Sequence, residues 1–219
     1  GNSERPTVLT GEAMNETTMF QEAVDNALLL EYCRICQLQL KVYFGETTNI
    51  VGLIERITKE EQSFKLTFNY YFFKFFSALG HAMAFDETGN RKAIAGIKKC
   101  LKILEQFEAS GTKNVVPLVR LVQAELLVCQ SKSKLSKVAS NIQEAYGVAI
   151  AAAKEASFVN IEALASERAA GILAVIEGFE GISMDFYKAS LTCYHEFGAD
   201  AKVDELDTII ERKVQESAS

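Results

Sequence analysis

The residues of this chain that could do chemistry are few, and the closest pair is Cys33-x-x-Cys36. A structural zinc site takes four ligands, and the other cysteines, Cys100, Cys129 and Cys193, stand singly along the sequence. A redox pair usually opens a helix, where the helix dipole lowers the pKa of a thiol, whereas Cys33 and Cys36 fall inside a helical pattern. We therefore expect five reduced cysteines that bind no metal.

The two histidines also lack the spacing of a catalytic site. His81 lies near the end of an aromatic helical pattern, and we expect it in the core or at its rim with a hydrogen-bond partner. His195 falls on the polar side of its helix and should be solvated. Neither histidine stands at a triad-like spacing from a serine or a cysteine.

Glu162, Glu167 and Arg168 share one helical pattern, which is typical of ion pairs along the surface of a helix. The sequence contains no P-loop, no glycine-rich dinucleotide loop and no His-Glu-x-x-His motif. We therefore predict no catalytic, cofactor-binding or metal-ligating residues, and no enzyme activity in this chain.

Composition places the chain among ordinary folded proteins, because 48% of its 219 residues are hydrophobic and 24% are charged. The formal net charge is -6 and the longest basic run is Lys98-Lys99, which argues against nucleic-acid binding. The sequence shows no signal peptide and no apolar run of about 20 residues, so we expect no membrane span. The odd number of cysteines in apolar helical patterns indicates a reducing compartment, and hence a cytoplasmic location.

Helical periodicity accounts for nearly the whole sequence, which has only two prolines to interrupt it. The pattern predicts an all-α fold of about nine helices, over residues 15–44, 48–59, 64–85, 91–108, 115–130, 135–156, 158–178, 184–197 and 199–216. Short turns favour antiparallel neighbours. Helix pairs that recur with a period in the thirties to forties of residues indicate a solenoid of the tetratricopeptide type.

The most apolar helix is expected over 64–85, with a buried stripe that contains Phe64, Phe68, Phe72, Phe75 and Leu79. Such an aromatic stripe also fits the wall of a ligand pocket, but aromatic residues at helical spacing are more often core.

The expected domain organisation has three parts. Residues 1–14 are interpreted as a disordered lead-in or cloning remnant, residues 15–216 as a single helical-repeat domain, and residues 217–219 as a linker or cloning-derived end.

The last third of the chain is rich in small residues at helical spacing, as two closely packed helices require. Its pattern runs through Tyr146-x-x-Ala149-Ile150-x-x-Ala153, Phe158, Glu162-Ala163-Leu164-Ala165-x-Glu167-x-Ala169-Ala170, Ala189 and Tyr194. It closes with Phe197-Gly198-Ala199-Asp200-Ala201-Lys202-Val203 and Leu206. Gly198 is predicted to make a tight turn between helices. Lys202 is predicted to contact either the carbonyls that end the preceding helix or a carboxylate on the neighbouring helix pair.

This pattern resembles the tetratricopeptide-like helical region of large multidomain sensor proteins. These also carry a serine/threonine-kinase-like domain, an ATPase module, a GAF domain and often a histidine kinase. The family usually has tryptophan where this chain has Phe197. The resemblance is sharp only over the last third, and it implies a helical connector between an ATPase module and sensor-kinase domains. It implies structural roles for Phe197, Gly198, Ala199, Ala201, Lys202, Val203 and Leu206, and no catalytic residue.

The leading hypothesis is therefore a non-catalytic protein–protein interaction and coupling module of a larger cytoplasmic signalling protein. Its partners would be proteins or neighbouring domains of the parent chain, and it would need no cofactor. The alternative is a ligand-sensing helical domain with a small molecule or peptide in the groove of the superhelix. Neither hypothesis specifies an oligomeric state.

Overall fold

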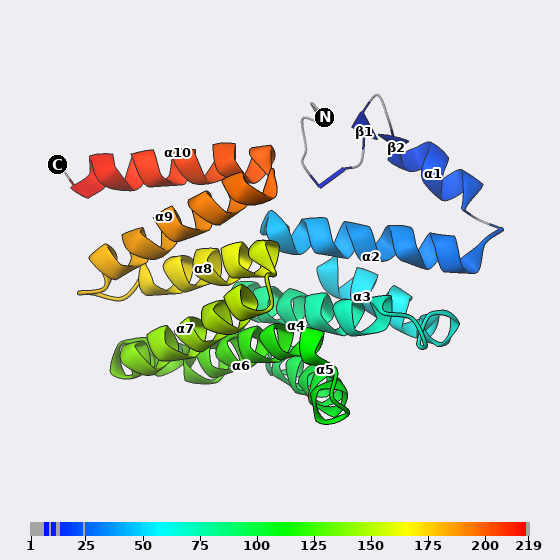
Figure 1. Cartoon of the computed structure of the whole chain (residues 1–219), viewed down its shortest axis with the longest axis horizontal. Helices are drawn as coiled ribbons and strands as arrows, with labels where there is room; N and C mark the ends of the chain where they lie inside the picture. The colour runs from blue at the N-terminus through cyan, green and yellow to red at the C-terminus, as the bar shows by residue number, and fades with distance from the viewer. Residues whose placement is uncertain (1–6, 9, 12–13, 24, 218–219) are drawn as a thin grey trace. The chain divides into compact units, whose positions relative to one another are not determined.

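The segments with helical apolar periodicity form helices in the computed structural model of the chain (Figure 1). The structure describes residues 7–8, 10–11, 14–23 and 25–217. A pair of two-residue strands, β1 (Thr10–Gly11) and β2 (Met14–Asn15), precedes the helices. The predicted all-α class is confirmed.

The chain divides into two compact units, residues 1–106 and residues 107–219, here called unit 1 and unit 2. The single helical-repeat domain expected over 15–216 stays a prediction. Much of the lead-in predicted over 1–14 lies outside the described residues, as do residues 218–219 of the predicted linker.

The first predicted helix is divided in two, which corrects the expectation of one helix over 15–44. The structure has α1 (Glu16–Glu22) and α2 (Ala27–Tyr43), separated by a short turn. Asn15 and Asn26 have extended backbones, and their side chains accept hydrogen bonds from the first-turn amides of α1 and α2. Asparagine is among the best N-cap residues, so Asn26 starts a new helix rather than continuing the old one.

Three further helices follow: α3 (Ile50–Lys59), α4 (Asn69–Thr88) and α5 (Arg91–Ala109), with a short 3-10 turn, η1 (Glu61–Ser63), before α4. The boundary between the two units falls near the end of α5. The helices α2, α3 and α4 pack against one another. Nearly every residue from Phe73 to Phe85 is buried, because α4 is covered on most of its circumference.

The aromatic stripe of α4 differs from the predicted one because the helix begins at Asn69 rather than at Phe64. Phe64 is buried in the turn before α4, where its ring packs edge-on against that of Phe73 with the ring centroids 5.6 Å apart. Phe68 is 58% exposed and Phe72 is half-buried. Phe73 and its neighbours therefore occupy the core position that the sequence pattern assigned to Phe72.

Unit 2 contains the 3-10 turns η2 (Lys113–Val115) and η3 (Lys132–Val138) and five helices. The helices are α6 (Val116–Ser131), α7 (Ala139–Glu155), α8 (Val159–Leu173), α9 (Glu180–Phe197) and α10 (Asp200–Ser217). Pro117 lies in the first turn of α6, where its missing N–H breaks no hydrogen bond. The helix expected from 135 begins only at Ala139, because the polar η3 segment is kinked at Lys134.

Consecutive helices of unit 2 pack side by side from α6 to α10, each antiparallel to the one before it (Figure 1). The α8–α9 seam is the most extensive of these contacts. The Ser183 hydroxyl donates to the Ala170 carbonyl and the Ser190 hydroxyl donates to the Ala163 carbonyl, both at 2.8 Å. Hydroxyls reach the backbone of a neighbouring helix only where small side chains let the two helices approach. The small-residue pattern therefore predicted this packing correctly.

Among the described residues, no helix combines the length and apolarity needed to cross a membrane.

Candidate functional site

The turn between α9 and α10 is formed by Phe197-Gly198-Ala199, the start of the motif that closes the sequence pattern. Gly198 has a φ of 77°, a left-handed conformation that glycine adopts without strain. The amides of Gly198 and Ala199 donate to the carbonyls of His195 and Tyr194, which closes the end of α9 as a Schellman motif. Gly198 thus takes the tight-turn role expected of it.

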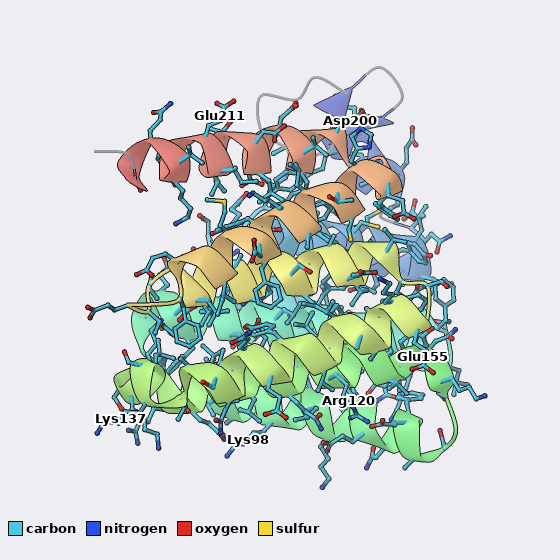
Figure 2. All side chains as sticks on the ribbon, turned by 60° about the vertical axis from the view of Figure 1, so that its left-hand side comes forward. Lys98, Arg120, Lys137, Glu155, Asp200 and Glu211 are labelled. Atoms are coloured by element: carbon cyan, nitrogen blue, oxygen red, sulfur yellow. The ribbon has the colours of Figure 1, made fainter. Side chains whose placement is uncertain are left out.

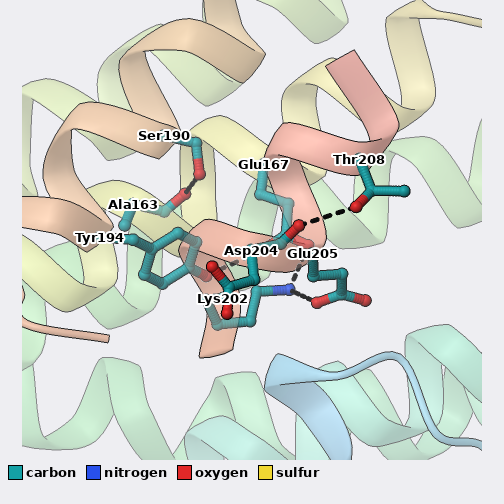
Figure 3. Close-up of polar contacts among 8 residues, drawn as sticks. All are labelled: Ala163, Glu167, Ser190, Tyr194, Lys202, Asp204, Glu205 and Thr208. Atoms are coloured by element: carbon teal, nitrogen blue, oxygen red, sulfur yellow. Dashed lines mark hydrogen bonds and ion pairs between the residues drawn. The ribbon is translucent and has the colours of Figure 1, made fainter. Parts of the chain in front are cut away.

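Lys202 is the most buried charged residue of this motif, with 3% of its side chain exposed. Its Nζ lies 2.7 Å from Glu167 Oε1 of α8 and 2.6 Å from Glu205 Oε2 of α10 (Figure 3). The Tyr194 hydroxyl of α9 donates to the other Glu167 oxygen at 2.8 Å. Of the two partners that the sequence left open for Lys202, the carboxylate on a neighbouring helix is therefore present. Glu167, Tyr194, Lys202 and Glu205 are called the Glu167 cluster.

A second buried cluster lies on the preceding helices. Glu125 of α6 is 2% exposed, and its Oε1 accepts a hydrogen bond of 2.6 Å from the Tyr146 hydroxyl of α7. Arg168 of α8 contacts both carboxylate oxygens, with Nη2 at 2.6 Å from Oε2 and Nε paired with Oε1. Burial, together with the charge of Glu125, raises the pKa of Tyr146 well above its ordinary value, so the phenol remains a donor. Glu125, Tyr146 and Arg168 are called the Glu125 cluster.

The two clusters share one pattern. In each, a glutamate accepts a hydrogen bond from a tyrosine on the next helix and pairs with a cation on the helix after that. The first cluster joins α6, α7 and α8, and the second joins α8, α9 and α10. Glu167 and Arg168 are adjacent on α8, so the clusters meet on that helix.

Sequence reasoning missed this repetition because the residue spacings differ. The tyrosines lie 21 and 27 residues after their glutamates, and the cations lie 43 and 35 residues after them. The expectation that Glu167 and Arg168 form surface ion pairs along one helix is wrong. Each pairs across helices, because α8 is covered by neighbours on both sides. Glu162 has a different kind of partner, because its side chain forms a hydrogen bond with the Cys193 thiol.

The cysteines are free thiols, with Cys33, Cys100 and Cys129 buried and Cys36 and Cys193 half-buried. Burial raises the pKa of Cys33 and Cys36, and it raises that of Cys100 to about 11. Burial and the charge of Glu162 raise the pKa of Cys193 to about 11. A thiol with a raised pKa stays protonated at neutral pH, whereas nucleophiles and metal ligands are thiolates. Within the described part of the chain, no three His, Cys, Asp or Glu residues could together hold a metal ion.

The histidines take different environments. His195 is exposed, as predicted. His81 is half-buried between α4 and α5, and its Nδ1 is buried with no hydrogen-bond partner in the structure. The expected partner of His81 is therefore missing at that atom. Its ring lies against Gly96, where a methyl group would come within 2.5 Å of Cδ2. Burial lowers the pKa of His81, although the charge of Glu55 opposes this effect.

Unit 1 also buries charge that the sequence pattern did not reveal. Lys74 is buried in α4, pairs with Glu61, and lies 4.7 Å from the centre of the Phe73 ring. Glu31 of α2 is buried and pairs with Arg34, while burial raises its pKa. Lys74 and Glu31 each have one oppositely charged partner, while the second carboxylate oxygen of Glu31, Oε2, is buried with no hydrogen-bond partner in the structure.

Comparisons of the chain with protein-family models, with curated proteins and with solved structures found no match. The resemblance to the helical region of large sensor proteins therefore stays a prediction. What the geometry itself provides is two sets of polar contacts, one that ties α6 to α7 and α8 and one that ties α8 to α9 and α10.

Proposed function

We propose that this chain is a non-catalytic protein–protein interaction and coupling module, built as a tetratricopeptide-like solenoid of antiparallel helix pairs. Its setting would be a larger cytoplasmic signalling protein, as the resemblance implies. The observation that carries the proposal is the glutamate–tyrosine–cation contact, made once across α6–α8 and again across α8–α10.

Repetition of this contact is consistent with a stack of helix pairs. In a solenoid, each repeat is stabilised chiefly by its neighbours, so the same kind of interface recurs along the stack. The pairs α6–α7 and α8–α9 are each followed by a helix whose cation, half-buried Arg168 or buried Lys202, pairs with the glutamate of the preceding pair. This order supports the solenoid interpretation for unit 2.

The same contacts supply a route for coupling. Energetic coupling between distant sites requires packed or hydrogen-bonded elements that move together. Because Arg168 pairs with α6 and Glu167 pairs with α10, a displacement of either outer helix acts on adjacent residues of α8. The buried polar groups of unit 2 thus support a mechanical role rather than a chemical one.

Binding to neighbouring domains of the parent protein tests this function. The purified chain should bind a flanking domain weakly, because a transient regulatory contact needs only a modest interface. A charge-reversal scan over the exposed charges of α6–α9 should identify substitutions that weaken binding and leave the melting temperature unchanged. Lys137, in η3 just before α7, and Glu155, the last residue of α7, are exposed and labelled in Figure 2, and they are suitable first positions.

Measurements of enzyme activity test the non-catalytic part of the proposal. The purified chain should neither hydrolyse nucleotides nor transfer phosphate to a protein substrate. Hydrolysis or phosphotransfer that a point mutation within the chain abolishes would contradict the proposal, and so would the absence of binding to any flanking domain.

A further inference from the structure

The helix α9 carries an apolar stripe that its neighbours cover only in part. Phe186, Ala189, Cys193 and Phe197 follow one another at spacings of three, four and four residues, which places them along one side of the helix. Phe197 is 58% exposed, Ala189 is exposed, and Phe186 and Cys193 are half-buried. These four residues are called the α9 stripe. Contiguous apolar side chains that reach solvent, unlike scattered single ones, are typical of an interaction surface.

The α9 stripe lies beside the buried seam between α8 and α9, at the edge of that seam away from α10. Ser190 lies in the seam and donates to the backbone of α8. At the stripe edge, Cys193 forms a hydrogen bond with Glu162 of α8. Tyr187 lies at the other edge, where the Lys213 Nζ of α10 lies 5.7 Å from the centre of its ring. The stripe is therefore bordered by α8, and α10 does not cover it.

The charged groups around the α9 stripe are mostly acidic. Burial raises the pKa of the Cys193 thiol, and the charges of Glu162 and Glu196 add to this effect. The charge of Lys154 on α7 opposes it, so these three charged side chains lie near the middle of the stripe. Asp185 is exposed on the same flank of α9 as Glu196. Three acids and one base give this surface a formal charge of -2.

This charge indicates what kind of partner fits the surface. A second copy of the chain would bring the same acids together, because a two-fold interface pairs a surface patch with itself. An anionic membrane would be repelled for the same reason. A basic helix with an apolar stripe of its own would instead pair with the acids and cover the apolar side chains.

We propose that the α9 stripe binds a basic amphipathic helix of a protein partner. This inference rests on the proposed function and names the chemistry of the partner. The apolar side chains of the partner helix pack on the α9 stripe, and its basic side chains pair with the flanking acids. The stripe extends over about 17 Å of α9, so a partner helix of about three turns covers it.

Three synthetic peptides of about 18 residues, longer than the stripe requires, test the proposal with the intact chain. The first has a leucine stripe at helical spacing and lysine elsewhere. The second has the same composition in a scrambled order, and the third has glutamate in place of lysine. Fluorescence anisotropy should show that the first binds about tenfold more tightly than either of the others. Equal binding of the first peptide and either control, or binding of none, overturns the proposal.

A matched pair of variants identifies the surface. Ala189→Lys places a positive charge within the α9 stripe and should weaken binding of the first peptide about tenfold. His195→Lys adds a positive charge to the opposite side of α9, at a residue that is also exposed, and should change binding less than about twofold. Equal effects of the two variants would place the binding surface elsewhere, and the inference would fail. Circular dichroism checks that both variants are folded.

Two more variants separate the apolar and the electrostatic contacts. Phe197→Ser removes the most exposed aromatic ring of the stripe and should also weaken binding about tenfold, which keeps the test open if Ala189→Lys does not fold. Asp185→Lys combined with Glu196→Lys should reverse the preference between the lysine and glutamate peptides. An unchanged preference would contradict the role of the acids.

Sedimentation separates this proposal from self-association. A dimer that Phe197→Ser breaks would mean that a second copy of the chain occupies the α9 stripe, which overturns the proposal. In that case binding of a flanking domain can persist through another surface, so the proposed function is tested separately.

Discussion

Ser157 adopts a conformation that glycine would hold at lower cost. Its φ is 57°, and the amides of Ser157 and Phe158 donate to the carbonyls of Lys154 and Ala153, which is the arrangement that Gly198 makes at the end of α9. A side chain in the left-handed region costs about 1–2 kcal/mol. Part of this is offset by the greater freedom of glycine in the unfolded chain.

We therefore expect Ser157→Gly to raise the free energy of unfolding by about 0.5–1 kcal/mol in urea titrations. Gly198→Ala is the matched control and should lower it by about 1 kcal/mol, because it introduces the same strain at the other turn. Unchanged or lower stability of Ser157→Gly would show that the serine side chain stabilises the turn.

His81 should make the stability of the chain depend on pH. Burial lowers its pKa below the usual 6.5, so the unfolded chain takes up a proton at a higher pH than the folded chain does. The contribution of His81 to stability is therefore complete above pH 6.5, and it is lost as the pH falls from 6.5 through the lower pKa of the folded chain. His81→Gln should flatten the pH profile of the melting temperature, and the exposed His195→Gln should leave it unchanged. Identical profiles for both variants would contradict the assignment.

At the scale of elements, periodicity located the helices but not all of their ends. The break at Asn26 depends on a side chain capping a backbone amide, which an apolar period does not encode. The same limit explains α4, where the aromatic residues continue through the turn before the helix. The helix begins at Asn69, five residues after the predicted start at Phe64. Phe72 therefore lies in the first turn of α4, where it is only half-buried.

The correction to α4 leads to a paired prediction. Phe73→Ala should lower the free energy of unfolding by about 3–5 kcal/mol, because it empties a fully buried aromatic position. Phe72→Ala should cost clearly less, since the ring of Phe72 is half-buried. Urea unfolding of both variants provides the measurement, and the reverse order of the two losses would mean that the sequence pattern had assigned the core correctly.

At the scale of the whole molecule, the sequence predicted the class of fold and the small-residue seam of α8 and α9, but not the polar clusters. Lys202 was singled out with two possible partners, whereas Glu125 was not singled out at all. The reason is physical. A contact between a helix and the second helix after it depends on turn lengths and helix rotation, so its sequence separation varies even when its chemistry repeats.

The coupling proposal predicts that the two clusters are not energetically independent. Arg168→Leu and Lys202→Leu each remove the cation of one cluster, and both changes release constraints on α8. In a double-mutant cycle followed by urea unfolding, their effects should deviate from additivity by at least about 0.5 kcal/mol, as groups within one network do. Arg120→Leu is the matched control, because Arg120 pairs with Glu108 rather than with α8. Combined with Lys202→Leu, it should be additive within about 0.3–0.5 kcal/mol. Additivity in both cycles would mean that the clusters stabilise α8 separately, and the stack would then hold its shape without transmitting displacement from α6 to α10.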